Sequence, residues 1–416
     1  MRVTFVSTND QKGGAAIVTQ RLMEALRARG VDARMVVARK SGCSEWVSEV
    51  DRRRWQLAFL RERAEIFVRS GFSRKDIWKV DTGRYGCGVP EHEWVREADV
   101  VVLGWVNQGM VSLGDVEKLH RMGKKIVWTM HDMWCATGIC HHSEDCRRYE
   151  TMCGRCRYAG THSGATDLST RVQMEKERLY GKVPIRFVAV SRWLGEVCRQ
   201  SALLRDARVD VVPNAMPVEQ FPPHSAMSRG EAGLPDEGAP VVMAAARLDD
   251  PIKDLPLAVD ALNRLHDMGL KERPVAVFCG EMKDAHCLDG LRLPYVYLGA
   301  VESRERMAAI FGHAAVVLSS SVRETLPGTL IEGMAAGATP VTTGAGGQSD
   351  IVEDGVDGYI LPPDTPAEAR AEGLALLMRK AIERPFDRDA QHTAASRRFA
   401  ADAVARRFLE VISRQE

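Results

Sequence analysis

Two apolar patterns alternate along the chain. Short apolar runs rich in β-branched residues, for example residues 98–105 and 314–318, predict buried strands. Between such runs lie longer segments whose apolar residues recur three and four positions apart, the spacing of an amphipathic helix. Strands that alternate with helices predict an α/β fold built on parallel sheets.

The first forty residues show this alternation most clearly. Residues 2–7 and 31–37 predict strands. Between them Gly13 and Gly14 open a helix. This order of strand, glycine-rich turn, helix and strand predicts the opening of a doubly wound, Rossmann-like sheet. A glycine pair is by itself weak support for phosphate binding.

A second unit of the same kind begins near residue 240. It follows residues 217–240, whose content of proline, glycine, glutamate and serine is typical of a linker. A chain of 416 residues is also long for a single hydrophobic core. We therefore expect two domains.

Composition narrows the class of protein. The chain is 45% hydrophobic and 27% charged, as in ordinary soluble globular proteins. A formal net charge of +1 gives no reason to expect a nucleic-acid partner. No apolar run reaches the roughly 18 residues that span a bilayer, and the N-terminus reads as a strand and not as a signal peptide. We expect a cytoplasmic protein whose ten cysteines are mostly reduced.

Residues 51–68 predict a charged amphipathic helix. The plain interpretation is a surface helix with one buried face. The alternative is an interfacial helix that rests on anionic lipid. That alternative would give the protein a peripheral contact with the cytoplasmic face of the inner membrane.

Four cysteines lie within residues 140–156, with five, six and two residues between them. Four thiolates make a closed tetrahedral zinc site, and a polar insert without an apolar core needs such a staple. His141 or His142 could replace one thiol, and free or disulfide-bonded cysteines remain the alternative. A catalytic zinc is not expected, because four ligands leave no open position. The expected zinc ligands are Cys140, Cys146, Cys153 and Cys156.

Two carboxylates, Glu324 and Glu332, lie eight positions apart in residues 319–333. The apolar run before them predicts a strand, and the residues after Pro327 predict a helix. Ligands of open α/β sheets bind at this junction, at the carboxyl ends of the strands. The alternative without a binding role is that both carboxylates are solvated charges at a helix end.

The segment from Glu324 to Glu332, ETLPGTLIE, resembles the signature of glycosyltransferase family 4, the retaining GT-B enzymes that use nucleotide sugars. Its form is similar to a subgroup common in bacterial polysaccharide clusters. The resemblance is strongest over residues 241–361 and weakest over residues 43–95. It implies a GT-B fold, in which two Rossmann-like doubly wound domains face each other across a cleft.

The resemblance also implies roles for single residues. Glu324 would face the donor sugar, and Glu332 would hold the ribose hydroxyls. Arg247 and Lys253 would clamp the diphosphate, as a guanidinium fork and an ammonium can. His131 would lie near the donor sugar and the reacting centre. The further substrate-binding residues that the resemblance implies are Gly13, Gly14, Leu326, Pro327, Gly328, Thr329, Gly346 and Gly347.

The implied domain organisation follows the same family. Residues 1–215 would form the acceptor-side domain, with a cysteine-rich insert at residues 135–160. Residues 216–397 would form the nucleotide-sugar-binding domain. Residues 398–416 would form a terminal helix that crosses back to the first domain.

The implied activity is a hexosyl transfer, without a metal at the donor site, from a nucleotide-diphosphate sugar to a glycan or polyprenyl-linked saccharide. Its setting would be the synthesis of bacterial exopolysaccharide or other cell-surface polysaccharide. Two alternatives stay open, a nucleotide-sugar epimerase of GT-B fold and a catalytically silent subunit that binds a sugar nucleotide.

Overall fold

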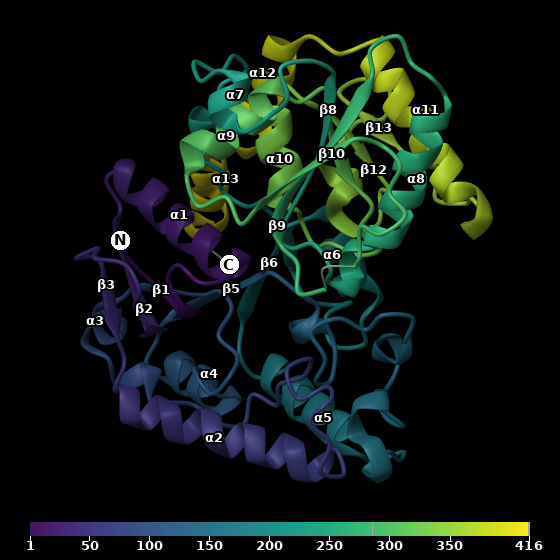
Figure 1. Cartoon of the computed structure of the whole chain (residues 1–416). Coiled ribbons are helices and arrows are strands. Elements are labelled where there is room, and N and C mark those ends of the chain that lie inside the picture. Colours follow the sequence, from purple (N-terminus) through teal and green to yellow (C-terminus); the bar gives the residue numbers. More distant parts are fainter. Residues whose placement is uncertain (285, 415–416) are drawn as a thin grey trace. The chain divides into compact units, whose positions relative to one another are not determined.

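The computed structural model describes residues 1–284 and 286–414 (Figure 1). The chain forms two compact units. Unit 1 comprises Met1–Ala215 together with the chain from Val404 onward, and unit 2 comprises Met216–Ala403. Each unit is an open parallel sheet covered by helices. The predicted fold class of two Rossmann-like α/β domains is therefore confirmed.

Unit 1 is built on a seven-stranded sheet in the order β3-β2-β1-β4-β5-β6-β7. Every strand pair in it is parallel, and Val3 of β1 lies opposite Ala33 of β2 and Val100 of β4. This order, with the first strand in the middle, is the doubly wound arrangement. The strands are β1 (Arg2–Asn9), β2 (Asp32–Arg39), β3 (Val47–Glu49), β4 (Val100–Leu103), β5 (Lys125–Met130), β6 (Ile185–Ala189) and β7 (Val209–Val211).

The helices of unit 1 begin where the sequence supplies caps. The side chain of Ser191 accepts a hydrogen bond from the backbone N–H of Leu194 at 3.2 Å. Ser112 and Asp115 form a reciprocal capping box. The helices are α1 (Gly14–Ala28), α2 (Arg52–Arg69), α3 (Glu93–Glu97), α4 (Leu113–Arg121), α5 (Leu168–Tyr180), α6 (Arg192–Gln200) and α13 (Ala401–Ser413).

Unit 2 repeats the plan with a six-stranded parallel sheet in the order β10-β9-β8-β11-β12-β13. Its strands are β8 (Ala239–Arg247), β9 (Pro274–Glu281), β10 (Tyr295–Gly299), β11 (Val316–Ser319), β12 (Thr339–Thr342) and β13 (Tyr359–Ile360). Its helices are α7 (Arg229–Ala232), α8 (Leu255–Asp267), α9 (Arg304–His313), α10 (Gly328–Ala335), α11 (Arg370–Glu383) and α12 (Arg388–Phe399).

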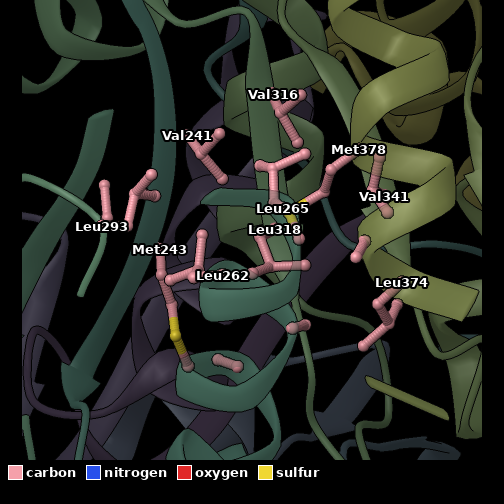
Figure 2. Packing of buried hydrophobic residues seen from close by; sticks show 14 of the residues in the cluster. Val241, Met243, Leu262, Leu265, Leu293, Val316, Leu318, Val341, Leu374 and Met378 are labelled. Carbon is pink, nitrogen blue, oxygen red and sulfur yellow. The ribbon is translucent and has the colours of Figure 1, made fainter. Parts of the chain in front are cut away.

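The core of unit 2 lies between its sheet and helices α8 and α11. Figure 2 shows Val241, Val316 and Val341 of three neighbouring strands beside Leu262 and Leu374 of these helices. All five side chains are at most 2% exposed. Burying one such side chain contributes about 1.5–3 kcal/mol. This core fixes the strands whose carboxyl ends carry the candidate site.

The C-terminal helical segment departs from the sequence expectation. The sequence predicts a terminal helix over residues 398–416, but Ala400 is extended (ψ 142°) and separates α12 from α13. The backbone N–H of Met216, the first residue of unit 2, donates to Phe399 O at 2.9 Å next to the break. Beyond it Phe408 stacks on Phe5 of β1 in unit 1, with ring centroids 6.2 Å apart. The last two residues of the expected terminal helix, 415–416, lie outside the described part of the chain.

Candidate functional site

The carboxyl ends of the unit 2 strands gather the charged residues predicted for the donor. Arg247 is the last residue of β8, and Lys253 lies in the 3-10 turn Pro251–Lys253 that follows it. Glu324 lies in the loop between β11 and α10. Because β8 and β11 are neighbours in the sheet, these residues share one edge.

Lys253 and Glu324 contact each other directly. The Lys253 ammonium donates to Glu324 Oε1, and Ser321 Oγ donates to the same oxygen at 3.2 Å. Both side chains are partly shielded, with 25% and 18% of their surface exposed. The two charges thus neutralise each other when no ligand is bound. A bound anion would compete with Glu324 for Lys253.

Arg247 is also paired within the chain. Its Nε lies 3.2 Å from Asp249 Oδ1, and one terminal nitrogen lies 3.5 Å from Asp250 Oδ2. Its side chain is 36% exposed. Arg247 therefore forms ion pairs with both aspartates, and these pairs alone could explain its position without a role in ligand binding. A partly exposed fork between two carboxylates can still accept a diphosphate by exchanging partners.

Gly346 and Gly347 hold the Glu324 peptide. The Gly347 N–H donates to Glu324 O at 2.7 Å, and a Cβ at Gly346 would overlap that oxygen. Gly346–Asp350 is a 3-10 turn fixed by buried Gln348. The Gln348 side-chain amide donates to Ser321 O at 3.0 Å. These glycines therefore fix the loop that carries Glu324.

Helix α10 continues from that loop. Leu326 and Pro327 are buried, and Pro327 is the N-cap residue without a side-chain hydrogen bond to the helix start. Gly328 and Thr329, the first two helical residues, are half-buried, so their backbone N–H groups lie at an uncapped helix N-terminus. Glu332 is the fifth residue of the helix and is also half-buried. An uncapped N-terminus favours a nearby anion.

In unit 1 the predicted glycine pair forms the start of α1. Gly13 is the N-cap residue with φ 90°, and Gly14 is the first helical residue. Both are exposed, and a Cβ at either position would meet nothing within 4 Å. The turn is therefore open to a ligand, while the positive φ at Gly13 favours glycine.

His131 follows the last residue of β5 and is half-buried. Its Nε2 lies 3.3 Å from Oγ1 of Thr19 on α1. The ring also lines a cavity of about 10 Å³, about the size of one water molecule, together with Val18, Leu22 and Thr129. Burial lowers the pKa of His131 to about 4, against the opposing charge of Asp132. The imidazole is therefore neutral at physiological pH.

A buried charged network stands next to His131, and sequence reasoning missed it. His141 bridges two carboxylates, with Nδ1 2.7 Å from Asp132 Oδ2 and Nε2 2.7 Å from Asp81 Oδ2. Arg63 of α2 donates to Asp81 as well. Burial alone would lower the pKa of His141, but the two carboxylates raise it to about 10. Protonated His141, which forms a hydrogen bond with each of the two carboxylates, thus fixes the turn that begins at His131.

Glu62 extends this network on α2. Its Oε1 accepts from the backbone N–H of Thr82 at 2.8 Å and of Gly83 at 3.0 Å. Burial, and then the charge of Asp81, raise the pKa of Glu62 to about 7. No sequence motif marks this network, because its members lie up to 79 positions apart, from Glu62 to His141. One sign of this network is present in the sequence, the charged residues Glu62 and Arg63 at helix positions whose neighbours are apolar.

The expected zinc site is not supported. All ten cysteines are free, and no group of three or more His, Cys, Asp or Glu side chains in residues 1–284 and 286–414 is placed to hold a metal. Burial raises the pKa of the Cys140 thiol to about 12 and of Cys153 to about 11, so both stay protonated. The four positions concerned are Cys140, Cys146, Cys153 and Cys156.

We expected zinc because a polar insert without an apolar core needs a metal to hold it. The insert does have apolar contacts. Cys140 and Cys156 pack against an apolar cluster that includes Ile66 of α2. Buried Lys176 of α5 donates to Trp134 O at 2.6 Å and to Thr137 O at 3.1 Å. Apolar contacts and hydrogen bonds therefore hold the insert. The cluster consists of Ile66, Val80, Ile139, Tyr158, Leu168 and Val172.

One Asp-x-Asp triplet occurs in the chain, at residues 387–389. Asp387 caps α12 by accepting from the Ala390 N–H at 2.8 Å. The Arg388 guanidinium between the aspartates donates to Pro223 O at 3.0 Å. The triplet serves the start of α12 and does not lie on the loops that carry Arg247, Lys253 and Glu324.

The described part of the chain contains no helix long and apolar enough to cross a membrane.

Comparison with known proteins shows similarity to glycosyltransferases. Residues 239–380 of unit 2 match the family model of Glycosyl transferases group 1. The 2-deoxystreptamine glucosyltransferase of Streptomyces kanamyceticus is 29% identical over 184 residues, 42% of this chain and 46% of that enzyme. The phosphatidyl-myo-inositol mannosyltransferase of Mycobacterium tuberculosis is 24% identical over 239 residues, 56% of this chain and 60% of that enzyme. The chain thus spans about half the length of these curated relatives.

Solved structures resemble the chain over its whole length. Anabaena HepE in complex with UDP and glucose has a TM-score of 0.63 and 15% identity, covering 99% of both chains. WaaG, a glycosyltransferase involved in lipopolysaccharide biosynthesis, has a TM-score of 0.60 and 15% identity, covering 99% of this chain and 100% of that one. At such identity the likeness shows the fold, and it confirms the predicted GT-B fold.

Proposed function

We propose that the chain is a GT-B glycosyltransferase that transfers a sugar from a nucleotide-diphosphate donor. Its likeness in fold to solved structures and the family match of residues 239–380 support this proposal. The acceptor is a glycan or a polyprenyl-linked saccharide of a bacterial surface polysaccharide, and the sugar is a hexose. The single observation that carries the proposal is the cluster of Arg247, Lys253 and Glu324 on one sheet edge of unit 2.

In this proposal the donor diphosphate binds the edge of unit 2. Arg247 and Lys253 exchange their carboxylate partners for phosphate oxygens, and the uncapped start of α10 adds backbone N–H groups. The structure of HepE with UDP and glucose supports a donor of this class. Losing Lys253 to the diphosphate frees Glu324 to face the sugar.

The reaction then proceeds with retention on one face of the sugar. The leaving diphosphate takes the proton of the acceptor hydroxyl as the new glycosidic bond forms. Arg247, Lys253 and the α10 amides stabilise the leaving group, and Glu324 stabilises the positive charge that grows at the anomeric carbon. Glu332 holds the ribose, and Gly13, Gly14 and His131 of unit 1 contact the sugar ligands. This chemistry needs positioning and electrostatics but no metal at the phosphates.

Two other functions would give different products from sugar transfer. An epimerase of GT-B fold would change the configuration of the nucleotide sugar without an acceptor. A silent subunit would bind the nucleotide sugar and leave it intact. The Lys253–Glu324 contact and Arg247 at one edge favour a working donor site over the silent subunit.

A thermal melt against UDP-, GDP- and ADP-sugars tests the donor proposal. A ligand that binds the native state raises the melting temperature by mass action, by about 2.7 kcal/mol of stability at a hundred times its Kd. We expect one nucleotide class to raise the melting temperature of the parent protein, and Arg247→Ala to lose that rise. A parent protein that responds to none of the three classes would overturn the proposal.

We also propose that α2 rests on anionic lipid. Its outer face carries Leu57 at 50% and Leu60 at 61% exposure, and Val68 at 47%. Of its two acidic residues, Glu62 is buried and Glu65 pairs with Arg84 at 2.6 Å. Its exposed charges are therefore all positive, which suits an anionic bilayer surface. The exposed arginines of α2 are Arg52, Arg53, Arg54, Arg61 and Arg69.

Sedimentation with vesicles tests this surface. The parent protein should bind vesicles that contain phosphatidylserine more than pure phosphatidylcholine, and high salt should weaken the binding. Leu57→Gln with Leu60→Gln should abolish it. Leu376→Gln on α11, where the side chain is 40% exposed, is the matched control and should bind as the parent does. Equal binding by the α2 variant would contradict the proposal.

A further inference from the structure

Thr19 and His131 come from parts of unit 1 that are 112 positions apart in the chain. Thr19 lies on α1 and is 4% exposed. Its hydroxyl contacts Nε2 of His131 at 3.3 Å and the backbone carbonyl of Ala15 at 2.7 Å. The end of β4 leaves room for it, since a Cβ at Gly104 would come within 2.9 Å of the hydroxyl. The fold thus places one buried hydroxyl against one ring nitrogen.

The directions of these two hydrogen bonds follow from proton counting. A threonine hydroxyl has a single hydrogen to donate and can accept with its lone pairs. The hydrogen goes to the shorter contact, the Ala15 carbonyl, which can only accept. Toward His131 the hydroxyl is therefore an acceptor, so Nε2 of the ring must carry a proton and donate it.

A neutral imidazole carries one proton. Burial against Thr19 and the apolar lining of the neighbouring cavity disfavours the charged ring, and the pKa of His131 falls to about 4. With that proton on Nε2, the other ring nitrogen, Nδ1, is left with a lone pair. Within residues 1–284 and 286–414, no group forms a hydrogen bond with Nδ1.

We propose that Thr19 is a positioning residue that holds His131 as the Nε2-protonated tautomer, so that Nδ1 accepts a hydrogen bond from a sugar hydroxyl. A lone pair on Nδ1 repels phosphate oxygens, which are themselves acceptors, and attracts an O–H group. His131 thus recognises the saccharide and not the diphosphate. This inference rests on the proposed function, because it takes a sugar as the ligand.

Matched variants of Thr19 separate positioning from packing. Thr19→Val keeps the shape of the side chain and removes the hydroxyl, whereas Thr19→Ser keeps the hydroxyl and removes the methyl group. A packing role would harm Thr19→Ser and spare Thr19→Val. The positioning role predicts the opposite order. With the donor class found by the melt, kcat of Thr19→Val should fall by about three- to tenfold, the loss that one hydrogen bond represents.

Two further readouts accompany the kinetics. Thr19→Ser should keep kcat near the parental value, and both variants should bind the free nucleoside diphosphate as the parent does. A kcat loss in Thr19→Ser that equals or exceeds that of Thr19→Val would overturn the positioning role. Weaker binding of the free diphosphate by Thr19→Val would overturn the assignment of His131 to the saccharide.

Long-range proton–nitrogen NMR of the histidine rings tests the tautomer without any activity. The His131 signals are identified as those missing from His131→Gln. The parent and Thr19→Ser should show the proton on Nε2, and Thr19→Val should show an increased share on Nδ1. A parent ring protonated on Nδ1, or on both nitrogens at neutral pH, would overturn the inference even if glycosyl transfer is established. Failure of transfer with the expected tautomer would overturn only the proposed function.

Discussion

The two sheet edges of this protein prepare their residues in different ways. At the unit 2 edge, charged side chains are partly exposed and paired with each other, as in Lys253 with Glu324 and Arg247 with Asp249. At the unit 1 edge, His131 is neutral, half-buried and held by a hydroxyl from α1. Paired surface charges can exchange partners when an anion arrives, whereas a half-buried neutral ring that Thr19 holds offers one fixed hydrogen bond to a ligand. We propose that unit 2 neutralises the charge of the ligand and that unit 1 recognises its hydroxyl groups.

Removing the unit 2 cations should have the largest effect. Arg247→Ala and Lys253→Ala each delete a charge-assisted contact with the leaving diphosphate, and a comparable deletion lowers kcat by about 10²–10³-fold. The melting temperature should stay near the parental value, because both side chains are partly exposed and their pairs add little stability. Steady-state kinetics with circular dichroism measures both quantities. Near-parental turnover in both variants would show that Arg247 and Lys253 take no part in the reaction.

The two carboxylates should fail in different kinetic parameters. Glu324 is assigned to the developing positive charge, so Glu324→Gln should depress kcat itself. Glu332 is assigned to the ribose, a contact much the same in ground and transition states, so Glu332→Gln should mainly raise KM. Full donor titrations of both variants give the two constants. If the residues were only structural, both variants would melt earlier and their activities would follow the folded fraction.

A pair of alanine variants compares the glycine turns of the two edges. Gly346 has φ 72°, and a Cβ there would overlap Glu324 O, so Gly346→Ala should cost about 1–3 kcal/mol and displace Glu324. Gly14 has open space and an ordinary φ, so Gly14→Ala should keep or slightly raise the melting temperature. A ligand at the Gly14 turn would show as weaker binding without loss of stability. Equal melting temperatures for the two variants would contradict this difference.

The smallest effect concerns the pH dependence of unit 1. The folded pKa of His131, about 4, lies below the usual value of 6.5. Between these two values the unfolded chain binds a proton that the folded chain does not, so stability falls as the pH drops from 6.5 towards 4 and is unaffected above 6.5. His131→Gln should lack this component.

Urea unfolding of both proteins at pH 7.5 and pH 5 measures that component. The midpoint of the parent should fall further on acidification than that of His131→Gln. Parallel shifts would mean that His131 is accessible to protons in the folded state, and the unit 1 edge would then resemble that of unit 2.

The sequence predicted one edge better than the other for a physical reason. Arg247 and Lys253 lie within a few residues of a strand end, and Glu324 and Glu332 share one loop and helix, so local pattern and resemblance located them. The ion pair between Lys253 and Glu324 was not foreseen. These roles remain proposals, although the positions agree with the expected elements.

The unit 1 edge depends on contacts that no local pattern encodes. Thr19 reads as one more residue of an amphipathic helix, and His141 reads as part of a cysteine motif. Only the fold brings Thr19 to His131, and His141 between Asp81 and Asp132. The zinc expectation failed for the same reason. The apolar cluster that supports the insert draws on Ile66 of α2, far away in the sequence.

The most direct test of the account follows the fate of a bound nucleotide sugar in the purified parent protein. The sugar nucleotide that raises the melting temperature is incubated with lipid-linked saccharides, and the products are separated and identified. The account predicts free nucleoside diphosphate together with a new glycosidic bond of retained anomeric configuration, and neither product with Lys253→Ala. An epimerised nucleotide sugar without nucleoside diphosphate release, or equal product from Lys253→Ala, would contradict it.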